Sequence, residues 1–146
     1  MTYLPDTSCI VALLCSWHEH HVATLREMNQ RAKNGDRMLL AAHSVVETYA
    51  VLTRLPFPYR LSEQDALRLL EENFSQAPVI ALSSVQYWRV IQECNEKKIS
   101  GGQAYDALIV ASAKKGKATV LLTWNLDHFT PFQDAELSIK SPVDKR

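Results

Sequence analysis

Residues 101–129 read GGQAYDALIVASAKKGKATVLLTWNLDHF, and this stretch indicates the fold class. An apolar helical pattern follows Asp106, and the basic turn at residues 114–117 closes it, with a glycine suited to a left-handed cap. Residues 119–122 are too short for a helix and apolar enough for a strand buried on both faces. That strand is followed by the polar loop at residues 123–127. Because ligands bind at such loops in open parallel α/β sheets, we expect a site here.

Short apolar segments alternate with helical patterns along the rest of the chain. This alternation predicts a three-layer α/β/α fold with a mostly parallel central sheet of about five short strands. The expected strands cover residues 2–5, 37–42, 77–82, 119–122 and 137–140. Right-handed crossovers bring the carboxyl ends of such strands to one edge of the sheet. No internal repeat or long linker divides the chain, so we expect residues 1–146 to form a single domain.

The composition is that of a soluble globular chain, with 47% hydrophobic and 22% charged residues. Its 16 basic and 16 acidic residues give a formal net charge of zero, so no overall electrostatic attraction to nucleic acid or to an anionic membrane is expected. Apolar runs fall short of the roughly 18 to 20 residues of a membrane span, and we expect a cytoplasmic protein without membrane contact. Cys9, Cys15 and Cys94 lack CxxC spacing, which favours buried free thiols over disulfides or structural zinc.

Acidic side chains follow two of the expected strands. Asp6 comes directly after the first strand, and Glu47 lies near the start of the helix after the second. Each has a structural explanation as well, since Asp6 or Ser8 can cap a helix, and Ser44 with Glu47 matches a capping box. Asp106 lies near the start of an apolar helix. Because carboxylates are rarely buried, we expect it to have a charged or hydrogen-bonding partner or a functional role. We expect these acids to meet the loop after the last buried strand at one sheet edge.

Carboxylates brought within a few ångströms of each other repel unless a cation lies between them. Oxygen ligands, without cysteine or histidine at metal spacing, favour Mg²⁺ or Mn²⁺ over zinc. The histidine-rich run at residues 18–21 has no HExxH arrangement, and we interpret it as a solvated helix start. A hard divalent ion at this edge can activate water and neutralise charge during displacement at a phosphodiester.

Four segments together resemble one known family. They are PDTS at residues 5–8, SVVE at 44–47, YDALIVASA at 105–113 and LLTWNLDHF at 121–129. In this order they resemble the PIN-domain ribonucleases, and the VapC-like toxins of bacterial toxin–antitoxin pairs in particular. The resemblance implies a PIN-like fold and a Mg²⁺- or Mn²⁺-dependent endoribonuclease, usually a homodimer, held inactive by a cognate antitoxin. It also implies that Asp6, Glu47 and Asp106 are the metal-binding acids.

The last segment departs from the family pattern. Members carry an acid or asparagine two residues after the threonine, and often another acid just before the phenylalanine. This chain has Asn125 at the first position and His128 at the second, with Asp127 one place early. We take Asn125 as a site residue and Asp127 as a further candidate. Ser8 and Thr123 are supporting candidates that could orient a ligand or a metal-bound water, with cap and turn roles as the alternative.

The resemblance implies that the substrate is RNA. Trp124 is a candidate for stacking an unpaired base, and a core position is its alternative. Basic candidates for flanking phosphates are Lys114, Lys115 and Lys117, with Arg54, Arg60, Lys97 and Lys98. The segment at residues 57–59 is a candidate dimer or antitoxin surface by resemblance.

Two other functions compete with the ribonuclease. A receiver-type signalling domain would need an acceptor aspartate after its middle strand, and residues 81–84 offer none. A PIN-fold scaffold that binds partners without catalysis remains an alternative.

Overall fold

A four-stranded parallel sheet forms the centre of the computed structural model, which describes residues 1–143. Its strands lie in the order β2-β1-β5-β6. Their bounds are Thr2–Pro5 for β1, Arg37–Met38 for β2, Val120–Leu122 for β5 and Ser138–Lys140 for β6. Every neighbouring pair is parallel, so the strands end at a common edge. The predicted parallel α/β fold is confirmed.

A second parallel sheet contains β3 (Leu40–Ala41) and β4 (Val79–Ile80). The predicted strand at residues 37–42 is therefore divided between two sheets, and the single-strand prediction was wrong. The Leu39 N–H still bonds to the Tyr3 carbonyl, whereas the Leu40 N–H bonds to the Pro78 carbonyl. The next bond of the ladder to β1 would require an N–H from Pro5, which proline lacks, so this ladder ends here, whereas Leu40, on the other side of the strand, pairs with β4.

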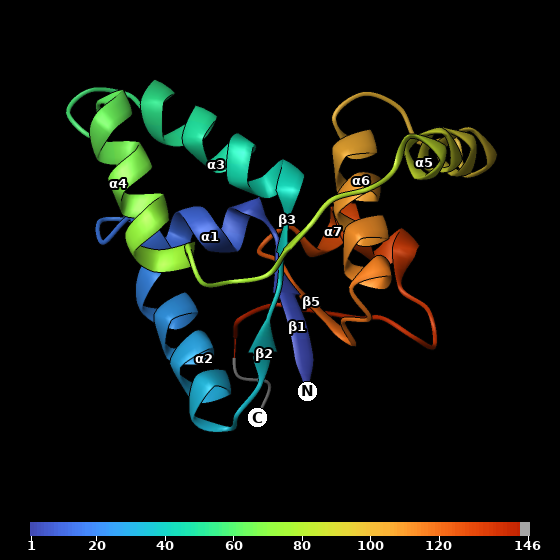
Figure 1. Ribbon diagram of the computed structural model, residues 1–146, viewed down its shortest axis with the longest axis horizontal. Coiled ribbons are helices and arrows are strands. Elements are labelled where there is room, and N and C mark those ends of the chain that lie inside the picture. The colour runs from blue at the N-terminus through green and yellow to red at the C-terminus, as the bar shows by residue number, and fades with distance from the viewer. Residues whose placement is uncertain (144–146) are drawn as a thin grey trace.

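Helices cover both faces of the central sheet, as Figure 1 shows, with α1 to α4 on one side and α5 to α7 on the other. Their bounds are Thr7–Leu14 for α1, His21–Lys33 for α2, Ala42–Arg54 for α3, Glu63–Phe74 for α4, Ser84–Glu96 for α5, Gln103–Lys115 for α6 and Leu126–Phe129 for α7. A 3-10 turn, Thr130–Phe132, follows α7. The three layers agree with the predicted architecture.

The capping box that the sequence suggested for α3 is absent from the structure. The helix begins at Ala42, and its N-cap, Ala41, makes no side-chain cap bond. Ser44 is instead buried inside the helix, which places Glu47 beyond the first turn. The structure shows a complete capping box at α5, where Ser83 and Gln86 bond each other's backbone N–H groups.

Gly116 has a different role from the predicted left-handed cap. Its φ is −77°, and Lys117 takes the left-handed conformation with a φ of 60°. A Cβ on Gly116 would lie 2.5 Å from Cδ1 of Leu39 and 3.1 Å from Cγ1 of Ile80. Close packing of the end of α6 against the side chains of Leu39 and Ile80 therefore favours glycine.

The strand periodicity divides the core into two sides. Tyr3, Val120 and Leu122 face one cluster, and Leu4 and Leu121 face the other. Cys9, Cys15 and Cys94 are buried free thiols, as predicted. Among residues 1–143, no helix is long and apolar enough to cross a membrane.

Candidate active site

The predicted acids line a single cavity of about 530 Å³. Asp6 reaches it from the start of α1, Glu47 from α3 and Asp106 from the first turn of α6. Asn125, which follows β5, lines the same space. The structure thus brings together four side chains separated widely in the sequence, at the carboxyl edge of the central sheet.

Asp6 is buried, with 2% of its surface exposed, and it caps α1. Its Oδ1 accepts a 3.0 Å bond from the Cys9 N–H and a 2.6 Å bond from the Ser8 hydroxyl. Its Oδ2 accepts a 2.6 Å bond from the Thr123 hydroxyl. These bonds use three of the about four lone-pair sites of a carboxylate, which leaves capacity for one further contact.

Ser8 and Thr123 each connect Asp6 to the backbone after β5. The Ser8 Oγ accepts a 3.0 Å bond from the Trp124 N–H. The Thr123 Oγ1 accepts a 2.9 Å bond from the Asn125 N–H. The acid and the loop that carries Asn125 are therefore held in one fixed arrangement.

Burial raises the pKa of the Asp6 carboxyl, and the bonds from Ser8, Thr123 and Cys9 lower it. Burial also raises the pKa of Asp106, to about 6; nearby His128 lowers it, and the charges of Asp6 and Glu47 raise it. The charges of Asp6 and Glu47 therefore act on the pKa of Asp106 across the cavity. Such mutual repulsion is what a bound cation relieves.

Two histidines contact the acids. His43 Nε2 lies 3.1 Å from Oε2 of Glu47, one helical turn away on α3. His128 Nδ1 lies 3.5 Å from Oδ2 of Asp106. The His43 ring also stacks on Tyr105, with centroids 5.1 Å apart and planes at 12°. The spacing of His43 and Glu47 could have indicated the first contact, because residues at i and i+4 are neighbours on a helix.

The donor set fits a hard divalent cation. Asp6, Glu47, Asp106 and the Asn125 amide supply oxygen atoms, the ligands that Mg²⁺ and Mn²⁺ prefer. Within residues 1–143, no three Asp, Glu, His or Cys side chains are close enough together to hold an ion as they stand. The acids therefore line one space without forming a closed metal cage.

Asp127 is not part of the cavity lining. It lies exposed in the first turn of α7, while Asn125 at the N-cap of this short helix faces the cavity. Trp124 lines the cavity, but its ring stacks on His20 and its indole N–H donates to Thr24 at 2.9 Å. This environment favours the core alternative for Trp124 over a ring open to a base.

Most of the basic residues predicted to contact RNA lie outside the acid cavity. Lys114 and Lys115 end α6, and the eight residues after Asp106 place Lys114 about 12 Å along the helix. Lys114 pairs with Asp134, and Lys115 donates 2.7 Å to the Ala81 carbonyl. These lysines line a separate cavity of about 210 Å³, together with Lys97.

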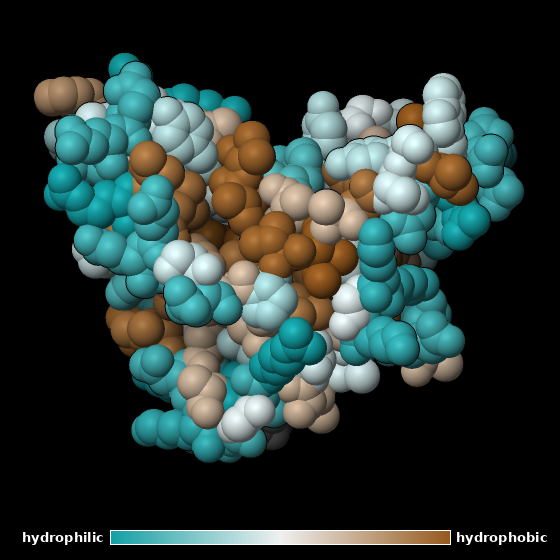
Figure 2. Space-filling model, in the orientation of Figure 1, coloured by the Kyte–Doolittle hydropathy of each residue, from teal (hydrophilic) through white to brown (hydrophobic). Residues whose placement is uncertain are grey.

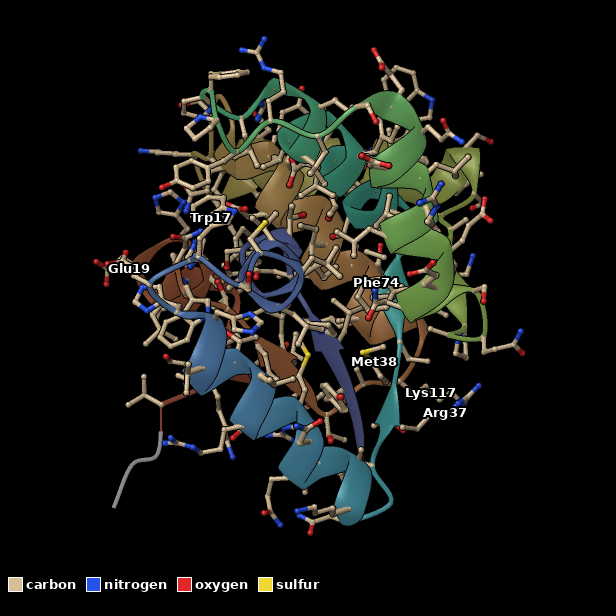
Figure 3. All side chains as sticks on the ribbon, turned by 90° about the vertical axis from the view of Figure 1, so that its left-hand side faces the viewer. Trp17, Glu19, Arg37, Met38, Phe74 and Lys117 are labelled. Atoms are coloured by element: carbon tan, nitrogen blue, oxygen red, sulfur yellow. The ribbon has the colours of Figure 1, made fainter. Side chains whose placement is uncertain are left out.

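Lys117 precedes β5 and therefore lies at the opposite edge of the sheet from the acids. In Figure 3 it appears near Arg37, away from Glu19. Lys114, Lys115 and Lys117 do not line the acid cavity, because α6 runs antiparallel to the strand that follows it and ends at the opposite edge of the sheet. Of the other basic candidates, Arg54 lines the acid cavity.

The loop before α2 contributes residues that the sequence interpretation left out of the site. His18, Glu19 and His20 line the acid cavity, although the sequence suggested only a solvated helix start. The helix itself begins at His21. The sequence signal for this part of the site was three histidines within four residues. Contact of residues 18–20 with the cavity depends on how α1 and α2 pack.

Comparisons with known proteins identify the family of this chain. A family model for the PIN domain matches residues 3–130. Ribonuclease VapC40 of Mycobacterium tuberculosis is 37% identical over 117 residues, which are 80% of this chain and 82% of VapC40.

Solved structures share the fold at lower identity. VapC20 of M. tuberculosis, a toxin that cleaves the sarcin–ricin loop, aligns with a TM-score of 0.71 and 17% identity, covering 88% of this chain and 94% of that one. VapBC2 of Rickettsia felis, bound to a promoter DNA fragment, aligns with a TM-score of 0.70 and 18% identity, covering 97% and 98%. With the family model and VapC40 as evidence of descent, this chain belongs to the PIN-domain family and, within it, to the VapC ribonuclease toxins.

Proposed function

We propose that this VapC-family chain is a Mg²⁺- or Mn²⁺-dependent endoribonuclease, the toxin of a toxin–antitoxin pair. One observation carries the proposal: Asp6, Glu47 and Asp106, from three different helices or helix starts, line one cavity at the sheet edge. All-oxygen side chains in a cavity open to solvent suit an ion that keeps water and substrate positions free.

Asp6, Glu47 and Asp106 would hold the ion, and Asn125 would add its amide oxygen. A bound ion would lower the pKa of a water and neutralise charge on the phosphate that is cut. The protein's part is to hold the acids in place before substrate arrives. Ser8 and Thr123 do this for Asp6, because each hydroxyl is bonded both to the carboxylate and to the backbone after β5.

We propose two protein partners, a cognate antitoxin and a second copy of the chain. Support comes from exposed apolar side chains on two regions. Trp88 and Ile91 lie three residues apart on α5 and are both exposed, beside an apolar groove that Tyr105 and Ile91 line. The second region is the α3–α4 loop, where Phe57 is 89% exposed. Figure 2 also shows hydrophobic residues gathered in the hollow between the α3–α4 side and the α5–α6 side.

We place this activity in the cytoplasm, with residues 1–146 acting as one domain. Cys9, Cys15 and Cys94 are unpaired and buried, a pattern that a reducing compartment permits.

The test is cleavage of single-stranded RNA with Mn²⁺ or Mg²⁺ and with chelator, for the wild type, Asp6→Asn and Asp106→Asn. Asp65→Asn is the matched control, because Asp65 is an exposed acid in the first turn of α4. We expect cleavage by the wild type and the control only, and only with metal. Cleavage in chelator or by the two site variants would contradict the metal mechanism. Failure of the wild type to cut any RNA would favour the partner-binding scaffold.

A further inference from the structure

The loop between α1 and α2 lies at the active-site cavity and is held there by aromatic contacts. The His20 ring stacks on Trp124, with centroids 3.9 Å apart and planes at 8°. Toward the other end of the loop, Trp17 stacks on Tyr59 of the α3–α4 loop, with centroids 4.3 Å apart and planes at 27°. We call residues 15–20 the cavity loop.

Backbone bonds add to these stacks. The His18 N–H donates 2.9 Å to the Cys15 carbonyl, and the His21 N–H donates 3.0 Å to the His18 carbonyl. The His21 ring nitrogen Nδ1 lies 2.9 Å from the Ala12 carbonyl. These contacts arrange the loop backbone and the rings of Trp17 and His20 before a ligand binds. Such preorganisation lowers the entropy cost of binding.

The cavity loop presents a hydrogen-bond donor. The His20 N–H donates 3.0 Å to Nδ1 of His18, so this nitrogen is an acceptor, and the hydrogen of the neutral ring lies on Nε2. Burial lowers the pKa of His18, with a further lowering from His20 that outweighs the raising effect of Glu19. The neutral ring therefore offers an N–H group in the cavity lining.

The loop also presents acceptors. Glu19 lines the same cavity, and its side chain is 83% exposed, with Oε1 3.5 Å from His20 Nε2. Figure 3 shows Glu19 projecting outward beside Trp17. An ionised carboxylate accepts at both oxygens and is suited to a partner with two adjacent donors.

Given the proposed ribonuclease function, on which this inference rests, we propose that the cavity loop reads an unpaired guanine next to the cut. The Watson–Crick edge of guanine carries the O6 acceptor beside the N1–H and N2–H donors. Glu19 would accept from the two donors, and His18 would donate to O6. Uracil, cytosine and adenine each lack two adjacent donors on this edge, so a carboxylate would bind them less well.

The dimensions of the site agree with one nucleotide. The cavity of about 530 Å³ lies within the range of about 300 to 1,000 Å³ that is usual for small-ligand pockets. Asp6 and Asp106 share this space with the cavity loop, so a base held by the loop would belong to a nucleotide at or beside the cut. Because the Watson–Crick edge is open only in unpaired RNA, the substrate segment must be single-stranded.

The experiment uses two oligoribonucleotides that differ only in one guanosine, which inosine replaces in the second. Inosine keeps O6 and N1–H and lacks the exocyclic amino group. The position is first chosen by sequencing the cleavage ends of an RNA with a randomised single-stranded region. Ratios of kcat/KM for the two substrates are then measured for the wild type, Glu19→Gln and Glu19→Ala. Glu72→Gln, an exposed acid on α4, is the control.

We expect the wild type and the control to prefer guanosine over inosine by about tenfold or more, since a bond to a charged acceptor is lost. Glu19→Ala should cut the two substrates equally well, and Glu19→Gln, which keeps one uncharged acceptor oxygen, should show a smaller preference than the wild type; both should have unchanged Mn²⁺ affinity. Wild-type cleavage without guanine enrichment would overturn the inference and leave the ribonuclease proposal standing. A guanosine preference that persists in Glu19→Ala would overturn it in the same way. If the wild type cuts no RNA with Mn²⁺, both proposals fail together, and this is seen before any variant is made.

Discussion

The Thr123 hydroxyl donates a 2.6 Å hydrogen bond to Oδ2 of Asp6, across 117 positions of sequence. Both groups are buried, and the same hydroxyl accepts from the Asn125 N–H. One side chain thus joins the start of α1 to the loop after β5. The relationship makes the hydroxyl of Thr123 a structural requirement of the proposed metal site.

Thr123→Val should lower stability by about 1–3 kcal/mol, because the Asp6 oxygen and the Asn125 N–H both lose a buried partner. Urea unfolding with chelator present measures this change. Thr123→Ser keeps the hydroxyl and should retain most of the lost stability and the Mn²⁺ affinity. A loss in Thr123→Ser without a loss in Thr123→Val would show that packing of the methyl group, and not the hydrogen bonds, is what matters.

Asp106→Asn should stabilise the metal-free protein at pH 8. The folded pKa of Asp106 is about 6, above the ordinary value of 3.8, so the folded state binds the proton more tightly than the unfolded state. The stabilising contribution is fully present below pH 3.8 and is lost as the pH rises through about 6. Asparagine does not ionise, so the variant does not lose stability as the pH rises. It should therefore be more stable than the wild type at pH 8 and no more stable at pH 3.5.

Urea midpoints over this pH range with chelator provide the measurement. Added Mn²⁺ should raise the wild-type midpoint at pH 8 and have little effect on Asp106→Asn, because binding to the folded state alone stabilises it. A wild-type midpoint at pH 8 equal to that of the variant would show that neither burial nor the charges of Asp6 and Glu47 destabilise the Asp106 carboxylate in the metal-free cavity.

Asn125→Ala should weaken Mn²⁺ binding by about tenfold or more, whereas Asp127→Ala should leave it unchanged. Asn125 lines the acid cavity, and Asp127 lies exposed in α7. Isothermal titration of each variant with Mn²⁺ separates the two candidates. A loss of affinity in Asp127→Ala alone would reverse their assignment.

Gly116→Ala should destabilise the fold by about 1–3 kcal/mol through overpacking. The new methyl group would meet Cδ1 of Leu39 at 2.5 Å, and Leu39 is buried. Gly102→Ala is the control, because no atom lies within 4 Å of its Cβ position and its φ is −62°. Its effect should stay within about 0.5 kcal/mol. Thermal unfolding of both variants compares them, and equal midpoints would mean that Leu39 moves aside at no cost.

Trp88→Glu should convert a dimer to a monomer, because it places a charge on the exposed apolar face of α5. Sedimentation velocity at micromolar concentration measures the species present. Leu67→Glu, at an exposed apolar position of α4, should remain dimeric. A wild-type chain that sediments as a monomer would contradict the homodimer proposal.

Much of the fold follows from local pattern. The apolar run at residues 120–122 and the alternating helical segments predicted a parallel α/β sheet, because strands buried on both faces have no polar alternation. The same pattern placed Asp6 and Asn125 at strand ends. Local pattern failed at residues 37–42, where the ladder to β1 ends and pairing with β4 begins. It also failed at the start of α3, where Ser44 is buried inside the helix and does not cap it.

Local features of the sequence were enough to predict the three layers, the edge of the sheet that carries the site and the acids Asp6, Glu47 and Asp106 that line it. These depend on residue periodicity and chain direction, which are local properties. The three-dimensional structure was needed to show that Thr123 and Ser8 hold Asp6, that Asp127 lies outside the cavity, and that residues 18–20 line it. Those relationships are contacts between helices, strands and loops distant in the chain, and their geometry is fixed by how the helices pack on the sheet.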